Sequence, residues 1–337
     1  MFLIQPQEEL LLLFLRKKIN SMTIQLIKNR SDIGAGTRGS DMGIDAMEIA
    51  AINQNNDFFN RHSFMDVKTH NESIYHKNTN TFAKRIEHVQ QQCQRVCDAV
   101  RKSFEEKFFP IVLSGDHSSA LGTISGIKSI FPEKTLGVIW IDAHADLHSP
   151  FTSPSGNIHG MPIAAAMNMD NLSDKINDPE ESTLHQWHQM KNLGMEGPKF
   201  SPDHLIYFGL RDYEFAEQNI INQFSIKAYK VEEVRLNRLT VCVQDALERL
   251  QNCDHIYISF DVDSMDCDQI SYGTGTPVPV GFTPEEVMCI MEQLVASKKV
   301  SCIEFAEINP LLDNKGNKMA ETAFQVLNFV SEKLKIA

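Results

Sequence analysis

Residues 136–146 read LGVIWIDAHAD, an apolar run that ends directly in two aspartates with a histidine between them. An apolar run of this length is typical of a strand that is buried on both faces, as the strands of parallel sheets are. The polar residues then stand at the carboxyl end of the strand, where open α/β sheets bind their ligands. This stretch predicts both a fold class and the place where the chemistry lies.

The same apolar pattern recurs along the chain. Further buried strands are predicted at residues 109–113, 205–208, 256–260 and 300–305. The stretches between the strands, such as 81–104 and 239–250, are long enough for crossover helices. Thr283, Pro284 and Glu286 form a helix start, because Thr283 is a good N-cap and Glu286 completes a capping box. Alternating strands and helices predict an α/β fold with a mostly parallel central sheet.

The chain has 337 residues, 42% of them hydrophobic and 23% charged, which is ordinary for a globular protein with a sizeable core. Large α/β enzymes of this length often form one domain, so we expect a single domain at residues 23–337 after an N-terminal extension at 1–22. The apolar run at 10–15 is too short to span a membrane, which needs about 20 apolar residues. It also lacks the charge order of a signal peptide. It is interpreted as a helical appendage or as an extension upstream of a start at Met22.

The formal net charge is −12. An acidic chain is a poor partner for nucleic acid, whose phosphates are bound by clustered lysines and arginines, whereas it weakly favours a cationic small substrate. The seven cysteines are odd in number and scattered along a long chain. Reduced thiols in a cytoplasmic protein are therefore predicted rather than a disulfide framework, and no membrane association is expected.

Two other stretches are interpreted as structural. Residues 34–39 read GAGTRG and match the GxGxxG pattern of dinucleotide-binding loops, but the following Ser40 and Asp41 are a poor opening for the helix that this motif requires. We interpret the stretch as a glycine-rich loop without a nicotinamide cofactor. Residues 168–198 are polar and irregular, and we expect an elaborated surface connection in which His185 and His188 are solvated.

Acidic residues and histidines follow three of the predicted strands. They are His117 after residues 109–113, then Asp142, His144 and Asp146 after 136–141, and finally Asp261 and Asp263 after 256–260. In extended backbone, residues two apart point to the same side, and the carboxyl ends of parallel strands share one edge of a sheet. All six side chains are therefore expected in one pocket. Four carboxylates gathered there are costly without a counter-charge, which a pair of divalent metal ions supplies.

The ligand set indicates which metal the site prefers. Four carboxylates and two imidazoles form a hard, oxygen-rich set that suits manganese, with cobalt or iron as substitutes, whereas structural zinc prefers thiolates or a closed set of four ligands. We therefore expect two Mn²⁺ ions per subunit. Two metals about 3.5–4 Å apart share a bridging water and lower its pKa, giving hydroxide near neutral pH. This chemistry predicts a hydrolase.

The combined motifs resemble the ureohydrolase family, which comprises arginases, agmatinases, guanidinobutyrases and formiminoglutamases. The resemblance extends over residues 27–326 and includes the glycine-rich loop, SGDHS, DAHAD, SFDVDSMD, GTGTPV and EINP. The likeness is greatest to the arginases. It implies a three-layer α-β-α fold, a small-molecule substrate and assembly into a homotrimer or homohexamer.

Residues 153–160, SPSGNIHG, resemble the arginase loop that holds the α-carboxylate of the amino acid. By that likeness Ser153, Ser155 and Asn157 bind the carboxylate, and polar groups of this kind suit it. His159 is implied as the carrier of a proton to the leaving amine, a role that suits an imidazole near neutral pH.

Glu307, in the EINP stretch, resembles the acid that holds the substrate guanidinium. A carboxylate can accept two parallel N–H bonds from a guanidinium and so fix the position of its carbon. Thr276, in the GTGTPV turn, is implied as an assisting residue. Asp146 is implied both to ligate metal and to orient the bridging hydroxide.

Residues 209–214, GLRDYE, resemble the segment that approaches the substrate α-ammonium, with Asp212 and Glu214 as the binding acids. The chain departs from the family here, because arginases usually have a second aspartate at the position of Glu214. His148 stands where many arginases have an asparagine near the carboxylate, and Ser114 replaces a more usual glycine. None of these departures affects a predicted metal ligand.

These features predict hydrolysis of L-arginine to L-ornithine and urea, with the bridging hydroxide attacking the guanidinium carbon. Another ureohydrolase specificity, for agmatine, 4-guanidinobutanoate or formiminoglutamate, is the alternative within the same chemistry. Agmatine has no carboxylate, so the loop at 153–160 would have no partner. A different class, a non-catalytic metal-containing arginine-binding protein, is a further alternative, although every predicted ligand and His159 are present.

Overall fold

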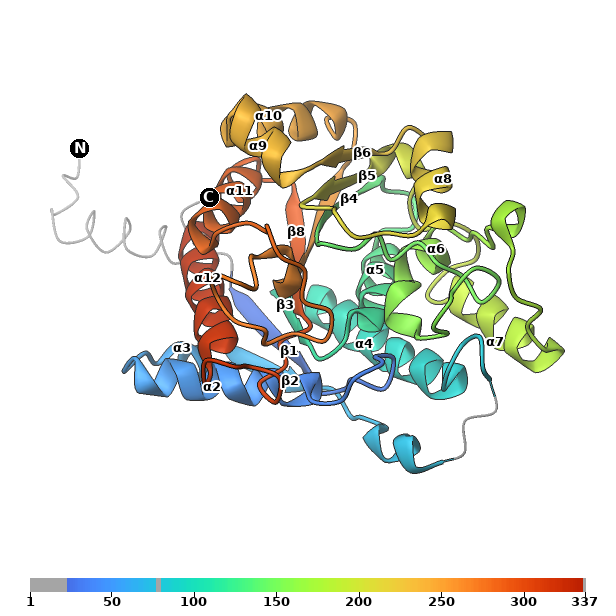
Figure 1. Cartoon of the computed structure of the whole chain (residues 1–337). Coiled ribbons are helices and arrows are strands. Elements are labelled where there is room, and N and C mark those ends of the chain that lie inside the picture. Colours follow the sequence, from blue (N-terminus) through green and yellow to red (C-terminus); the bar gives the residue numbers. More distant parts are fainter. Residues whose placement is uncertain (1–22, 77–79, 336–337) are drawn as a thin grey trace, which may run out of the picture.

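The computed structural model describes residues 23–76 and 80–335, so the predicted extension at 1–22 lies outside the described residues. The described chain contains an eight-stranded sheet in the order β2-β1-β3-β8-β7-β4-β5-β6 (Figure 1). Its strands are β1 (Ile24–Asn29), β2 (Ser63–Asp66), β3 (Phe109–Ser114), β4 (Leu136–Ile141), β5 (Leu205–Phe208), β6 (Lys227–Tyr229), β7 (His255–Asp261) and β8 (Val300–Ala306). All neighbouring strands are parallel, which confirms the predicted class.

Helices cover both faces of the sheet and give three layers (Figure 1). One face carries α2 (Gly43–Asn53), α3 (Phe58–Arg61), α9 (Val231–Asn237), α10 (Leu239–Arg249), α11 (Pro284–Ala296) and α12 (Lys318–Leu334), and the other carries α4 (Ile86–Glu105), α5 (Ala120–Ile130), α6 (Pro162–Ala166), α7 (Glu181–Lys191) and α8 (Phe215–Gln223). Along β4, Ile139 and Ile141 pack on the first face and Val138 and Trp140 on the second, as the alternation of side chains along a strand requires. The expected three-layer architecture is confirmed. Among the described helices, none is long and apolar enough to cross a membrane.

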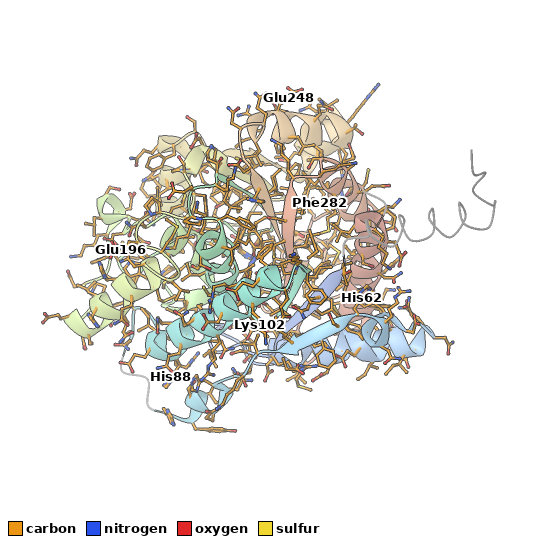
Figure 2. All side chains as sticks on the ribbon, turned by 180° about the vertical axis from the view of Figure 1, so that it is seen from behind. His62, His88, Lys102, Glu196, Glu248 and Phe282 are labelled. Carbon is orange, nitrogen blue, oxygen red and sulfur yellow. The ribbon has the colours of Figure 1, made fainter. Side chains whose placement is uncertain are left out.

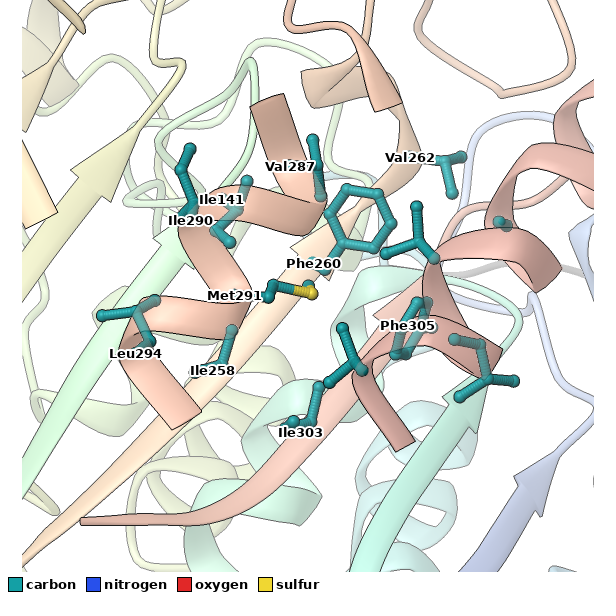
Figure 3. Packing of buried hydrophobic residues seen from close by; sticks show 14 of the residues in the cluster. Ile141, Ile258, Phe260, Val262, Val287, Ile290, Met291, Leu294, Ile303 and Phe305 are labelled. Carbon is teal, nitrogen blue, oxygen red and sulfur yellow. The ribbon is translucent and has the colours of Figure 1, made fainter. Parts of the chain in front are cut away.

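The core between α11 and strands β7 and β8 illustrates how helices are fixed to the sheet (Figure 3). Ile290 and Leu294 of α11 are fully buried, as are Phe260 of β7 and Phe305 of β8. The two phenylalanine rings pack edge to face with centroids 5.3 Å apart. Full burial of a side chain of this size stabilises the fold by about 1.5–3 kcal/mol. This packing holds the strands at whose ends the predicted site lies.

The strands predicted from apolar runs are all present, with bounds that differ by at most one residue at each end. The predicted capping box of α11 is also present, because Thr283 Oγ1 accepts from Glu286 N at 3.2 Å and Glu286 Oε2 accepts from Thr283 N at 2.9 Å. The crossover stretch at 81–104 becomes helical only from Ile86. Arg85 has a positive φ of 58°, which a right-handed helix does not allow, so residues 81–85 form a loop.

The expectation that residues 168–198 form an irregular connection is wrong in part. Glu181–Lys191 is the helix α7, and its Trp187 and Met190 are buried. These two apolar residues are three positions apart, which is a helical spacing, but the polar residues around them weaken the pattern. His185 and His188 are exposed, as predicted.

The glycine-rich loop at 34–39 does connect a strand to a helix. A 3₁₀ turn at Ser40–Met42 leads directly into α2, so the argument that this stretch opens a helix poorly is wrong. The loop is fastened to the predicted site, because Gly34 N donates to Asp116 Oδ2 at 2.9 Å and Gly34 O accepts from His159 N at 3.2 Å. A Cβ at Gly34 would come within 2.5 Å of Ser118 Oγ, so this close approach requires glycine.

Candidate metal centre and substrate pocket

The predicted site residues lie at the carboxyl ends of β3, β8, β7 and β4, which are neighbours at the centre of the sheet. His117 follows β3; Asp142, His144 and Asp146 follow β4; Asp261 ends β7 and Asp263 comes just after it; and Glu307 follows β8. Because the strands are parallel, these ends lie at one edge of the sheet. The six side chains predicted as metal ligands meet there.

His117 is in contact with carboxylates from two other strand ends. Its Nδ1 atom lies 3.0 Å from Asp142 Oδ2 and 3.2 Å from both Asp146 Oδ2 and Asp261 Oδ2. His117, Asp142 and Asp146 together could hold one metal ion.

A second group of possible ligands forms around His144. Its Nδ1 atom lies 3.0 Å from Asp263 Oδ2 and 3.5 Å from Asp142 Oδ1. His144, Asp142 and Asp263 could hold another metal ion. Asp142 belongs to both groups, so its carboxylate is suitably placed to bridge two metals.

The backbone that brings these side chains together is not extended, contrary to the prediction. Asp146 has a φ of 53° in the left-handed region, and Asp263 lies in a 3₁₀ turn, Val262–Ser264. Asp261 Oδ1 accepts a hydrogen bond from Asp263 N at 2.8 Å, which holds that turn. The convergence is therefore produced by tight turns. A non-glycine residue in the left-handed region, such as Asp146, costs roughly 1–3 kcal/mol, and such residues cluster at functional sites.

The ring of His117 is held from the side opposite the carboxylates. Its Nε2 atom lies 2.7 Å from Ser259 Oγ on β7, and the ring stacks on Trp140 with centroids 4.1 Å apart. A hydrogen bond from Nε2–H to Ser259 leaves the lone pair of Nδ1 directed at the carboxylates. Metal-binding histidines are typically oriented by such an outer hydrogen bond.

The cluster has the chemistry of a cation site. His117 Nδ1 and Asp142 Oδ2 are buried and lie 3.0 Å apart, but neither makes a hydrogen bond of good geometry to a described residue, and buried polar atoms orphaned in this way are rare. Burial and the neighbouring carboxylates raise the pKa values of Asp261 and Asp263. A divalent cation would give the orphaned atoms a partner and keep the carboxylates ionised. The residues present therefore fit a pair of metal ions.

Glu307 and His159 form a pair beside the cluster. Glu307 has a φ of 65° and is buried. Its Oε1 atom accepts a hydrogen bond from His117 N at 2.9 Å and lies 3.0 Å from His159 Nδ1. Burial alone would lower the pKa of His159, but the hydrogen bond and charge of Glu307 raise it to about 9. His159 is thus stabilised in its protonated form.

A cavity of about 270 Å³ extends outward from the cluster. Its lining includes most of the predicted site residues, among them Asp146, His159, Ser153, Ser155 and Asn157. Ser153 Oγ accepts from Gly156 N at 2.9 Å and Ser155 Oγ from Asn157 N at 3.1 Å, so both hydroxyls also shape their own loop. The loop predicted to bind a carboxylate therefore forms part of the wall of the cavity whose floor is the cluster.

Two of the three positions where the chain departs from the family pattern, His148 and Glu214, contact each other. His148 Nε2 lies 2.9 Å from Glu214 Oε2 and 3.6 Å from Glu217 Oε2. Glu217 is almost fully buried and accepts from Leu147 N and from Glu214 N, each at 3.0 Å. Burial raises the pKa of Glu217 to about 8.

Asp212 and Thr276 lie closer to the cluster than their predicted roles imply. Asp212 Oδ2 is 3.7 Å from His144 Nε2, and Thr276 Oγ1 donates to Asp263 Oδ2 at 3.1 Å. Both residues line the cavity. Their contacts place them beside predicted metal ligands as well as beside the substrate space.

Sequence reasoning missed two residues that the structure places at the site. Glu217 lines the cavity, and its signal was its place three residues after Glu214 at the start of α8, the spacing of a capping box. Ser259, which orients His117, lies two residues before Asp261 and thus points with it in a strand. Both signals become informative only once Glu214 and Asp261 are assigned to the site.

Comparisons with known proteins agree with this geometry. A profile described as the Arginase family matches residues 23–330. The chain is 34% identical over 307 residues to the arginase of Bacillus subtilis (strain 168), covering 90% of this chain and 96% of that protein. It is 31% identical over 315 residues to the arginase of Bacillus caldovelox, covering 92% and 99%.

Solved structures show the same relationship. The Bacillus caldovelox arginase structure matches with a TM-score of 0.79 at 30% identity, covering 92% of this chain and 98% of that one. A formimidoylglutamase from Bacillus subtilis matches with a TM-score of 0.71 at 18% identity, covering 94% and 89%, and so shares the fold.

The fold and the site define an α/β protein with a candidate metal centre at the carboxyl edge of a parallel sheet. The chain belongs to the arginase family. Members of this family are hydrolases that act on C–N bonds of linear amidines, and the protein is assigned to that class of enzyme.

Proposed function

We propose that the protein hydrolyses L-arginine to L-ornithine and urea with two Mn²⁺ ions held by His117, His144 and the four aspartates. The observation that carries this proposal is that one cavity joins the cluster to the loop at 153–160. A guanidinium beside the cluster would leave the amino-acid end of arginine at that loop. The matching relatives that are named arginases support this substrate.

The metal pair, when bound, supplies a water of lowered pKa as the nucleophile. Glu307 is proposed to accept N–H bonds from the guanidinium and to hold its carbon in place. His159 is proposed to carry a proton and to donate it to the departing amine. Asp146 orients the nucleophile, and Thr276 supports Asp263 through its hydrogen bond.

The outer part of the cavity is proposed to recognise the amino-acid group. Ser153, Ser155 and Asn157 bind the α-carboxylate through their hydroxyl and amide groups. Asp212 and Glu214 lie on the side proposed for the α-ammonium, and His148 lies between the two regions, in contact with Glu214.

The test is urea release by the purified, manganese-loaded protein from arginine, agmatine and 4-guanidinobutanoate at matched concentrations. A strong preference for arginine is expected. Metal content and arginine binding without urea release would instead indicate a non-catalytic arginine-binding protein. A preference for agmatine would overturn the role of the loop at 153–160.

One observation favours a second specificity, for 4-guanidinobutanoate. This compound has the carboxylate of arginine but no α-amine. The contact between His148 and Glu214 partly neutralises the acid that would bind the α-ammonium. If 4-guanidinobutanoate exceeds arginine in kcat/KM, the hydrolase assignment stands and the arginine specificity falls.

We also propose a homotrimer or homohexamer, as the family likeness implies. Light scattering of the purified protein tests this assembly, and a monomeric mass would contradict it.

A further inference from the structure

Residues 81–84, just before α4, are hydrogen-bonded to the loop at 153–160, which is proposed to bind the substrate carboxylate. Lys84 N donates to Gly156 O at 2.7 Å. Gly156 has a φ of 71°, and a Cβ on it would collide with Thr81 O. Residues 81–84 therefore pack directly against the loop at 153–160, with glycine required at the contact.

The side chain of Lys84 extends this contact to Asn157. Lys84 Nζ donates to Asn157 Oδ1 at 3.2 Å. An ammonium group has donors and no acceptor, so it must face the oxygen of the amide and not the nitrogen. This contact specifies which way the Asn157 amide is turned, which in an isolated asparagine is ambiguous.

The Nδ2 end of the Asn157 amide is available to donate a hydrogen bond to a ligand. Asn157 Nδ2 lies beside Gly36, where a Cβ would come within 2.5 Å of it. Among the residues that the structure describes, Nδ2 donates to no acceptor, and Asn157 lines the cavity. An amide N–H₂ with a free donor suits a carboxylate oxygen.

The positive charge of Lys84 also favours binding of a substrate carboxylate. Within residues 23–76 and 80–335, its Nζ atom forms no ion pair with a carboxylate and donates to Asn157 Oδ1. The cavity itself is rich in acidic side chains, including Asp146, Glu214 and Glu217. A positive charge behind Asn157 offsets part of the repulsion that a substrate carboxylate meets there.

We propose that Lys84 is a positioning residue for substrate specificity: it orients the Asn157 amide and, with its positive charge, favours substrates that have a carboxylate at the end remote from the guanidinium. This inference rests on the proposed function and concerns binding of the remote end. It predicts that Lys84 acts on KM rather than on the chemical step.

The test compares the manganese-loaded wild type with Lys84→Met and Lys84→Arg, using kcat and KM for arginine and Ki for ornithine. Lys84→Met is expected to raise KM and Ki about tenfold with kcat changed less than about twofold, because a charge-assisted hydrogen bond is lost. Lys84→Arg keeps a donor and a charge, so it is expected to recover most of the affinity. Lys102→Met, at the other end of α4 (Figure 2), is the matched control for the loss of one positive charge.

A double-mutant cycle with Asn157→Ala separates positioning from a general structural role. If Lys84 acts through Asn157, Lys84→Met adds little to the loss already caused by Asn157→Ala. Equal losses in both backgrounds would overturn the inference, as would a fall in kcat without a change in KM. Absence of arginine hydrolysis in the wild type would instead refute the proposed function.

Discussion

At the floor of the cavity, the predicted metal ligands come from short segments that directly follow strands, whereas at the mouth the polar residues come from longer loops and the start of α8. His117, Asp142, Asp261 and Asp263 are almost completely buried. His117 Nδ1 lies 3.0 Å from Asp142 Oδ2 and 3.2 Å from Asp261 Oδ2, and Asp263 N donates to Asp261 Oδ1 at 2.8 Å. Ser155 and Glu214 at the mouth are exposed. The floor is fixed by the core of the sheet, and the mouth can change without disturbing that core.

Two of the three departures from the family pattern lie at the mouth of the cavity. His148 and Glu214 contact each other at the mouth, and Ser114 is the departure that lies deeper, where its hydroxyl donates to Glu304 at 2.7 Å. A change at the mouth alters which substrate end is recognised. A change at the floor removes the chemistry itself, so the two regions should respond very differently to substitution.

The largest effect is expected for Asp263→Ala. Asp263 contacts His144 and accepts a hydrogen bond from Thr276, so its loss removes a carboxylate from the proposed metal centre. Metal content should fall and urea release should drop below detection, measured by metal analysis and a urea assay. Asp268→Ala, an exposed acid in the following loop, is the control and should keep full activity. Near-normal turnover of Asp263→Ala would contradict the metal centre.

Glu307→Gln should lower kcat/KM for arginine by about 100-fold or more. The buried carboxylate is proposed to bind a guanidinium, and truncating one partner of a buried charge pair costs about 2–5 kcal/mol. Steady-state kinetics at saturating manganese measures the loss. Metal content should stay unchanged, which separates this effect from that of Asp263→Ala, and Glu285→Gln on the surface of α11 serves as the control.

Ser259→Ala tests the orientation of His117 at the floor. Removing the outer hydrogen bond of a metal-binding histidine typically weakens metal affinity by about 10–100-fold. Activity measured against manganese concentration should shift to higher metal, with maximal activity largely restored at excess manganese. Ser301→Ala on the neighbouring strand β8 should leave the manganese dependence unchanged. An unaltered curve for Ser259→Ala would show that the Ser259 contact does not tune the site.

The smallest effect is expected at the mouth, for His148→Asn. Glu214 would lose its imidazole partner and become free for the α-ammonium of arginine, but a half-exposed pair is worth only about 0.2–1 kcal/mol. KM for arginine should fall by about two- to fivefold, while KM for 4-guanidinobutanoate should not. If both substrates respond alike, the pair does not discriminate the α-amine.

The fold was predictable because strands buried on both faces appear in the sequence as short runs of apolar residues. The apolar runs at 109–113, 136–141 and 256–260 place β3, β4 and β7 within one residue of their bounds. The helix α7 was missed because its buried face consists of few residues, with Trp187 and Met190 among many polar neighbours. So few apolar residues do not predict a helix from the sequence, and their common face is recognised only from their burial in the structure.

The identity of the cluster was determined by the sequence alone, because a parallel sheet brings residues that follow its strands to one edge. The tertiary structure decided the geometry: Asp146 and Glu307 adopt positive φ values, and conformations this uncommon persist only where the surrounding structure imposes them. It also decided the pairs His148–Glu214 and Lys84–Asn157, whose partners lie 66 and 73 residues apart. Contacts at such separations depend on how loops pack on the finished sheet, and short-range sequence patterns carry no information about that packing.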